Sequence, residues 1–105
     1  MKHLVRRRLA AQESLEEIVL GIAEHDLDAA YRLVDAVEAS LDLLSEMPEA
    51  GPRYETENPA LSGRVRKWVI PRYRRYLLFY VFEKGVIHLI DVVDGKRDYT
   101  VEDSP

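Results

Sequence analysis

Residues Arg64–Asp98 decide the fold, and they read RVRKWVIPRYRRYLLFYVFEKGVIHLIDVVDGKRD. Glu83-Lys84-Gly85 predicts a tight hairpin in which the glycine takes a positive φ. The turn residues Pro71-Arg72 separate the earlier apolar segments. The pattern therefore predicts a small antiparallel sheet over about residues 64–94, with strands at Val65–Ile70, Tyr73–Phe82 and Val86–Val93.

The preceding part of the chain predicts two helices. In Ala11–His25 the apolar residues recur at the helical period, as Leu15, Ile18, Val19, Ile22 and Ala23. Glu13, Glu16 and Glu17 lie near its start, where the helix dipole favours negative charge. Asp26 and Asp28 offer N-caps for a second helix from about Asp28 to Met47, with an apolar seam at Tyr31, Val34, Val37, Leu41 and Leu44.

The connection between these helices is short, so we expect an antiparallel helical hairpin over about residues 11–47, ended by Pro48. His3–Arg7 adds a short N-terminal strand at a sheet edge. The expected fold class is α+β, with the hairpin packed on the sheet in one domain spanning residues 1–105.

The composition excludes several functional classes. The 105 residues include no cysteine, which excludes disulfides and thiolate metal sites and favours a cytoplasmic location. No apolar run approaches the roughly 20 residues of a membrane span, so no membrane association is expected. The three histidines lie on different expected elements, and no Gly-rich phosphate loop is present. We therefore expect no cofactor and no metal.

Charge is divided along the chain. Leu9–Ala60 carries thirteen acids and two bases, whereas Arg64–Arg75 carries six bases and no acid. Two interpretations stand: an acidic solvated helix face beside a basic strand, or a polarised surface whose basic side meets an acidic partner or nucleic acid.

The strand Tyr73–Phe82 is apolar on both of its faces. One face carries Tyr76, Leu78, Tyr80 and Phe82, and the other Leu77, Phe79 and Val81. By simple alternation, Val92 lies with Ile90 and Val93 lies with Leu89 in the next strand. The hairpin covers one face, so the other face predicts either a second chain over it or a sheet curved over its own side chains.

Five motifs in order resemble the ParE branch of the RelE/ParE superfamily of bacterial toxins. The resemblance covers about 90 residues and rests on Leu15–Ile18 (LEEI), Ala29–Arg32 (AAYR), Pro48–Gly51 (PEAG), Tyr76–Tyr80 (YLLFY) and Val92–Asp98 (VVDGKRD). One departure is Asp94, which stands where many members have histidine. The role of that histidine is therefore not carried over.

The resemblance implies a toxin of a type II toxin–antitoxin system, associated with plasmid stabilisation and growth inhibition. It implies that the chain inhibits DNA gyrase by binding, without catalysis, and that a cognate antitoxin neutralises it in a hetero-oligomer. The antitoxin's C-terminal segment would wrap the toxin, and operator DNA would be bound only through the antitoxin.

The RelE branch implies an alternative, a ribosome-dependent mRNA endonuclease. Its two strand lysines fall here on Trp68 and Ile70, and its pre-aromatic arginine on Leu77; Arg97 alone is retained. Lys67 has the opposite pleat parity to Trp68. A nuclease would depend on Arg97, Arg75 and Arg66; a third alternative is an inactive toxin-like binding module.

The expected partner-binding residues belong to the basic segment, the central strand and the C-terminal end of the sheet. They are Arg64, Arg66, Lys67, Trp68, Arg72, Arg74, Arg75, Tyr80, Lys96 and Arg97. Two of them have a structural alternative: Trp68 as a core residue, and Arg97 as the ion-pair partner of Asp94 or Asp98.

Overall fold

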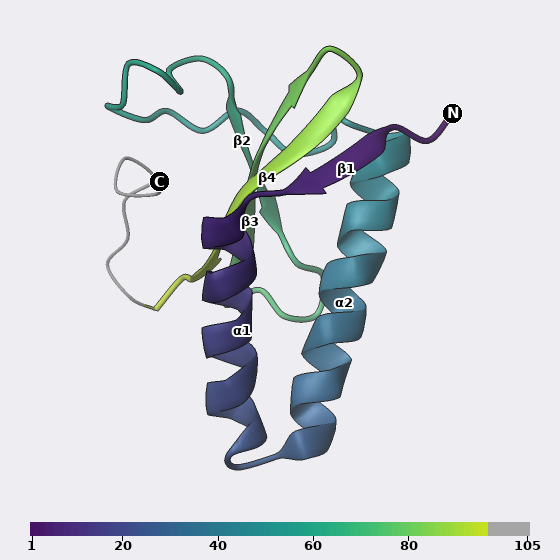
Figure 1. Cartoon of the computed structure of the whole chain (residues 1–105), viewed down its shortest axis with the longest axis vertical. Helices are drawn as coiled ribbons and strands as arrows, with labels where there is room; N and C mark the ends of the chain where they lie inside the picture. The colour runs from purple at the N-terminus through teal and green to yellow at the C-terminus, as the bar shows by residue number, and fades with distance from the viewer. Residues whose placement is uncertain (97–105) are drawn as a thin grey trace.

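A computed structural model describes residues 1–96 of the chain. Two antiparallel helices pack on one face of a four-stranded sheet whose strand order is β1-β4-β3-β2 (Figure 1). This confirms the α+β class and the helical hairpin. The elements in chain order are β1 (Leu4–Arg7), α1 (Leu9–Ala23), α2 (Leu27–Glu46), β2 (Val65–Val69), β3 (Tyr76–Glu83) and β4 (Val86–Asp94).

The helix boundaries follow the capping chemistry of the sequence. The Asp26 side chain accepts a hydrogen bond from the Ala29 N–H at 3.0 Å, so it is the N-cap of α2 as expected. Helix α1 begins at Leu9, two residues earlier than expected, and no acidic residue lies in its first turn. The expected interaction of Glu13, Glu16 and Glu17 with the helix start is therefore wrong.

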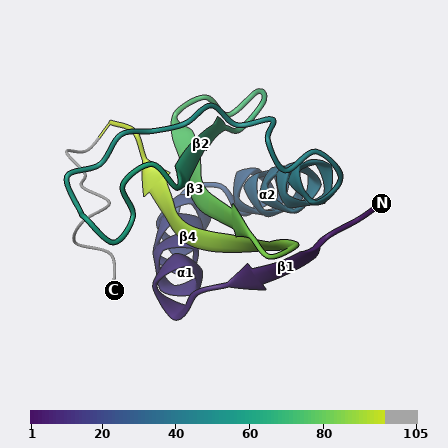
Figure 2. The same ribbon diagram turned by 90° about the horizontal axis from the view of Figure 1, so that it is seen from above.

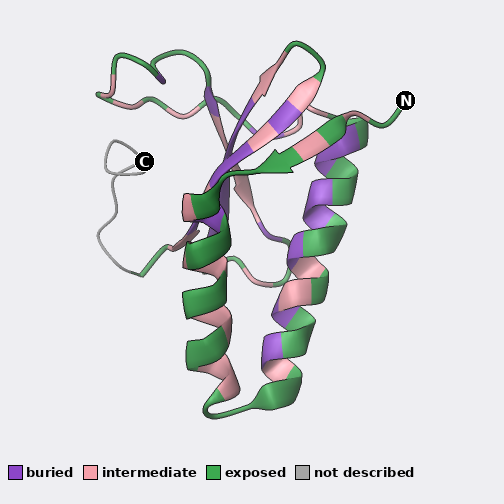
Figure 3. Cartoon of the chain, viewed as in Figure 1, coloured by how far each residue is buried: buried purple, intermediate pink, exposed green. Residues whose placement is uncertain are grey.

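The buried face of α2 begins one residue before the expected seam. Its buried apolar residues are Ala30, Leu33, Val37, Leu41 and Leu44, whereas Tyr31 is 62% exposed. The start of α2 projects with the end of α1 beyond the sheet (Figure 1), and there the buried side of α2 carries Ala30 and Leu33 rather than Tyr31. Figure 3 shows that the buried face of α2 turns inward along most of its length.

The sheet combines one parallel pair with two antiparallel pairs. Strand β1 runs parallel to β4 at one edge, while β2, β3 and β4 are antiparallel. Lys84 and Gly85 both have positive φ, at 52° and 76°, which confirms the tight β3–β4 turn.

A bulge in β4 changes which side chains face the helices. Phe79 pairs with Asp91 and Tyr80 pairs with Leu89, so Ile90 is an extra residue on β4. Val92 consequently packs with Leu89 in the core beneath the helices, and Val93 packs with Ile90 on the opposite face. The simple alternation expected for β4 is therefore wrong beyond the bulge.

The second apolar face of β3 is covered by the chain itself. Phe79 and Val81 are buried together with Leu61, which comes from the segment between α2 and β2 (Figure 2). Tyr54 of the same segment packs edge-on against Phe79, with ring centroids 4.9 Å apart. Covering by a second chain is thus wrong for this face, because residues expected to form only a loop supply the apolar cover.

One buried tyrosine fixes where that covering segment starts. The Tyr80 hydroxyl donates to the Pro48 carbonyl at 2.7 Å and accepts from the Gly51 N–H at 3.0 Å. The Arg66 guanidinium donates to the Gly51 carbonyl at 2.8 Å. These bonds satisfy the polar backbone groups at the exit of α2, and they tie the Pro48–Gly51 turn to β2 and β3.

Replacing Gly51 with alanine should destabilise the protein by about 1–3 kcal/mol. A Cβ at this position would lie 2.8 Å from the Lys67 carbonyl oxygen and 2.8 Å from the Tyr80 hydroxyl. The backbone contact cannot be relieved by a rotamer change. Urea unfolding of the two proteins measures this loss.

The matched control is Gly21→Ala in α1. A Cβ there meets no atom within 4 Å, so the substitution should stabilise the protein by about 0.5–1 kcal/mol through helix propensity. Equal effects of the two substitutions would contradict the packing described for Gly51.

Candidate functional site

The basic segment does not form one continuous charged patch. The Arg64 Nε donates to Glu83 at 2.6 Å, and Arg75 makes two bonds with Asp94 at 2.8 and 2.7 Å. The hydrogen bond from Arg64 lowers the pKa of the Glu83 carboxyl. Strands β3 and β4 thus supply, at Glu83 and Asp94, the acids that the basic segment itself lacks.

Lys67 and Trp68 lie on opposite faces of β2, as their parity predicts. The Lys67 ammonium lies 5.7 Å from the centre of the Tyr54 ring, on the face covered by the loop. The Trp68 indole lies on the helix face, where its N–H donates to the Ser40 hydroxyl at 3.0 Å. Trp68 is only partly buried, so it packs on the core and also reaches the surface.

Arg72 and Arg74 are exposed arginines of the turn between β2 and β3. Neither has an ion-pair partner within residues 1–96. Arg72 has a φ of 70°, a left-handed conformation that is uncommon for residues other than glycine. The turn continues to Arg75, and β3 begins at Tyr76 rather than at Tyr73 as expected.

Tyr80 does not reach the surface. Its side chain is fully buried and its hydroxyl is engaged by the Pro48–Gly51 turn. Burial raises the pKa of the phenol, an effect that the Gly51 N–H opposes. The expectation that Tyr80 contacts a partner is therefore wrong, and its role is to hold the exit of α2.

The arginines considered for nuclease chemistry are not brought together by the described structure. Arg66 pairs with Tyr80 across the sheet, whereas Arg75 precedes Tyr76. Five residues of strand correspond to about 17 Å along β3. Lys96 is exposed beyond the end of β4, and Arg97 lies outside the described residues.

The positions of the two nuclease lysines are occupied by residues of the core. Ile70 is fully buried, and Trp68 packs on the same cluster. Leu77, at the position of the pre-aromatic arginine, is 7% exposed. Within residues 1–96, moreover, no group of three His, Asp or Glu side chains is arranged to hold a metal ion.

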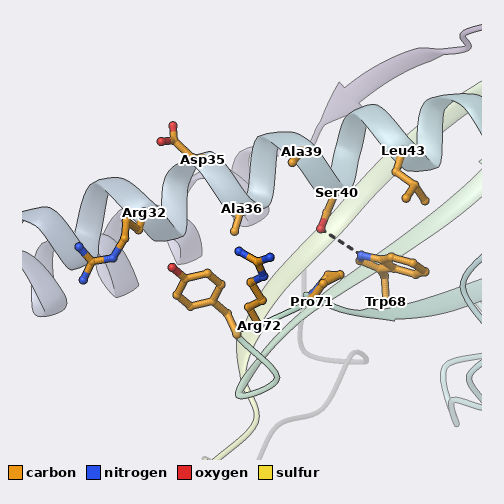
Figure 4. A pocket seen from close by; sticks show the side chains of 10 residues that line it. Arg32, Asp35, Ala36, Ala39, Ser40, Leu43, Trp68, Pro71 and Arg72 are labelled. Atoms are coloured by element: carbon orange, nitrogen blue, oxygen red, sulfur yellow. Dashed lines mark hydrogen bonds between the residues drawn. The ribbon is translucent and has the colours of Figure 1, made fainter.

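Two surface grooves were not predicted from the sequence. One of about 410 Å³ lies between α2 and the β2–β3 turn, and its wall includes Ala36, Ala39 and Trp68 (Figure 4). Another of about 370 Å³ lies between the two helices, beside β1, and its wall includes Leu15, Val19 and Val34. The small residues of α2 at helical spacing were the available signal for the first groove, but helical spacing alone does not distinguish a groove from a packed core.

The comparisons with known proteins place this arrangement in a family. The sequence model of one protein family, described as the ParE toxin of type II toxin–antitoxin system, parDE, matches residues 5–99. The chain belongs to this family. It is a ParE-type toxin, as the motifs from Leu15–Ile18 to Val92–Asp98 indicated.

A solved structure has a similar fold. The chromosomal ParDE toxin–antitoxin system from P. aeruginosa contains a chain that aligns with a TM-score of 0.71 and 14% sequence identity. The alignment covers 89% of this chain and 96% of that one. At this identity the likeness concerns the fold. Among curated proteins, no sequence matches this chain.

The departure of this toxin from the family pattern has a structural explanation. Asp94 has a side chain only 10% exposed, it binds Arg75, and it accepts from the Lys96 N–H at 3.0 Å. An acid at this position therefore closes the end of the sheet against the β2–β3 turn.

In the part of this toxin that the structure describes, no helix is long and apolar enough to cross a membrane.

Replacing Tyr80 with phenylalanine should destabilise the toxin by about 1–3 kcal/mol at neutral pH, because the Gly51 N–H and the Pro48 carbonyl lose their partner. Chemical unfolding measured from pH 7 to pH 11 checks this loss and its pH dependence.

The sign of the pH dependence follows from the raised pKa of Tyr80. The folded state keeps the phenolic proton above the ordinary value of 10.0, at which the unfolded chain loses it. The contribution is present below pH 10 and falls as the pH rises further. The difference between the wild type and Tyr80→Phe should therefore narrow above that pH; a constant difference would contradict the buried hydroxyl.

Proposed function

We propose that this ParE-type toxin inhibits DNA gyrase by binding to it, without catalytic chemistry of its own, and that a cognate antitoxin neutralises it. Two observations support this proposal. The chain belongs to the ParE toxin family, and core residues occupy the positions at which a RelE-type nuclease carries its cationic side chains. Cleavage of RNA needs a proton acceptor and cations that converge on one phosphate. Trp68 and Ile70 provide neither. Arg66 lies opposite Tyr80 whereas Arg75 precedes β3, and each is engaged in hydrogen bonds of its own.

The test is a supercoiling assay with purified toxin and gyrase. Added toxin should block supercoiling in a dose-dependent manner. In a separate primer-extension assay on ribosome-bound mRNA, neither the wild type nor the Arg97→Ala variant should produce cuts. No effect on gyrase at saturating toxin would contradict the proposal. Codon-specific cuts that disappear in Arg97→Ala would establish the nuclease instead.

A growth assay distinguishes a gyrase-inhibiting toxin from the remaining alternative, an inactive toxin-like binding module. A ParE-type toxin that inhibits gyrase should arrest growth when it is expressed without its antitoxin. Normal growth, combined with tight binding to the product of the neighbouring reading frame, would indicate an inactive toxin-like binding module.

We further propose that the antitoxin adds a strand at the β1 edge of the sheet. The opposite edge is covered, because the Lys67 N–H donates to the Pro52 carbonyl at 3.0 Å and the Tyr54 N–H to Val65 at 2.9 Å. Directly after β1, the Arg8 N–H donates to the Leu89 carbonyl of β4 at 3.1 Å, so alternation directs the N–H groups of Val5 and Arg7 outward. Outward backbone groups of this kind accept an added strand.

Charges on β1 favour an acidic segment at this edge. Arg7 is held by Glu38 of α2 through bonds of 2.7 and 2.6 Å, and the pKa of Glu38 is lowered by them. Arg6 and Arg8 are exposed and have no ion pair within residues 1–96. Two such basic edges would repel one another, which disfavours pairing of two toxin copies through β1.

The groove between the helices continues this surface. It is lined by Ala11, Leu15 and Val19 of α1, by Val34 of α2 and by Leu89 of β4. Only Ala11 of α1 is fully buried. A helix of the antitoxin that placed apolar side chains here would complete the burial of α1.

Replacing Val19 with glutamate should therefore separate toxicity from neutralisation. A carboxylate in the apolar groove should weaken antitoxin binding by at least roughly tenfold, while toxicity persists. Coexpression with the antitoxin should then fail to restore growth, and the affinity is measured by calorimetry.

Leu20→Glu is the matched control, because Leu20 is the next residue of α1, is 58% exposed and does not line the groove. The antitoxin should neutralise this variant as it neutralises the wild type. Neutralisation of Val19→Glu with unchanged affinity would contradict the proposed site.

This proposal also fixes the setting in which the toxin works. It would form a hetero-oligomer with the antitoxin, reach operator DNA only through the antitoxin, and meet gyrase in the cytoplasm. The expected partner-binding arginines Arg64, Arg72, Arg74 and Arg97 remain proposals for contacts with these partners.

A further inference from the structure

The groove between α2 and the β2–β3 turn has an apolar wall and a charged rim. Ala36, Ala39 and Leu43 of α2 form one side, and Trp68 forms the other. The indole is held in place because its N–H donates to Ser40 (Figure 4). Leu43 is 39% exposed. The volume of about 410 Å³ lies within the range of pockets that bind small ligands or a few side chains.

Arg72 is placed in this groove by an unusual backbone conformation. Its φ of 70° is positive, and a residue with a Cβ is disfavoured there. Figure 4 shows its guanidinium group below Ala36, between the turn and the helix. Strained residues of this kind are concentrated at sites that clamp ligands. The guanidinium of Arg72 is therefore a candidate ligand-binding group.

The charges around the groove favour a negatively charged occupant. Arg32 of α2 also lines it, and neither Arg32 nor Arg72 has an ion pair within residues 1–96. Asp35 is the single acid of the lining, and its carboxylate points to the other side of the helix (Figure 4). The accessible charge of the groove is thus positive over an apolar wall.

We propose that this groove binds an acidic peptide segment of a partner protein, with an apolar side chain between Ala39 and Trp68 and a carboxylate on Arg72. A guanidinium forms two parallel bonds with a carboxylate. The apolar wall gives the neighbouring side chain a surface that leaves water. The proposal needs only the groove and its charges, so it does not depend on gyrase being the target.

The chain offers a direct reporter for this site. Trp68 is its single tryptophan, and it lines the groove. Intrinsic fluorescence therefore reports binding at this place. The probe is an acetylated ten-residue peptide of alternating leucine and glutamate pairs, and its counterpart carries lysine in place of glutamate.

The acidic peptide should produce a saturable change in Trp68 fluorescence, and the basic peptide should bind at least tenfold more weakly. Arg72→Gly should weaken binding of the acidic peptide at least tenfold while the melting temperature is not lowered, because glycine accepts the positive φ. Arg72→Gln, which removes the charge but keeps a Cβ, should weaken binding to a similar extent.

Arg74→Ala is the matched control. It removes one positive charge from the same turn, but Arg74 does not line the groove. It should bind the acidic peptide like the wild type. No saturable change with the acidic peptide, equal binding of the basic peptide, or equal weakening by Arg74→Ala would each overturn the proposal. Because the assay contains neither gyrase nor antitoxin, its result is independent of the supercoiling test.

Discussion

The hydroxyl of Tyr80 is the interaction on which the rest of the structure depends. It joins the centre of the sheet to the turn that ends α2, where Pro48 and Gly51 would otherwise leave polar backbone groups buried without partners. The turn sends the chain across the far side of the sheet, where Tyr54 and Leu61 cover Phe79. The same segment covers the outer edge of β2, so β1 remains as the open edge within residues 1–96.

The proposed action by binding, without catalysis, accords with this arrangement. The strand positions that a RelE-type nuclease would use for cations hold Trp68 and Ile70, which pack beneath the helices. Arg66 faces the Pro48–Gly51 turn and donates to its carbonyls. Arg66 thus stabilises the exit of α2, while Trp68 and Ile70 belong to the core. The groove, the open edge and the exposed arginines form the surfaces that remain for partners.

Local signals in the sequence predicted the local structure well. Asp26 caps α2 and Gly85 turns the hairpin because both effects depend on neighbouring residues. The predicted phase of α2 was wrong at Tyr31, since adjacent apolar residues allow two faces and only tertiary packing decides between them. The bulge at Ile90 was not predicted either, because a bulge follows from pairing with a distant strand.

The candidate site was less predictable than the fold. The six bases of Arg64–Arg75 predicted a charged surface, but Arg64 forms an ion pair with Glu83 of β3 and Arg75 with Asp94 of β4. The burial of Tyr80 was not predicted, because a sequence does not reveal which turn its hydroxyl contacts. The most direct test is native-state hydrogen exchange at the Gly51 amide. It should exchange only through global unfolding, at the rate of the sheet core; exchange as fast as that of an exposed loop would contradict the central role of Tyr80.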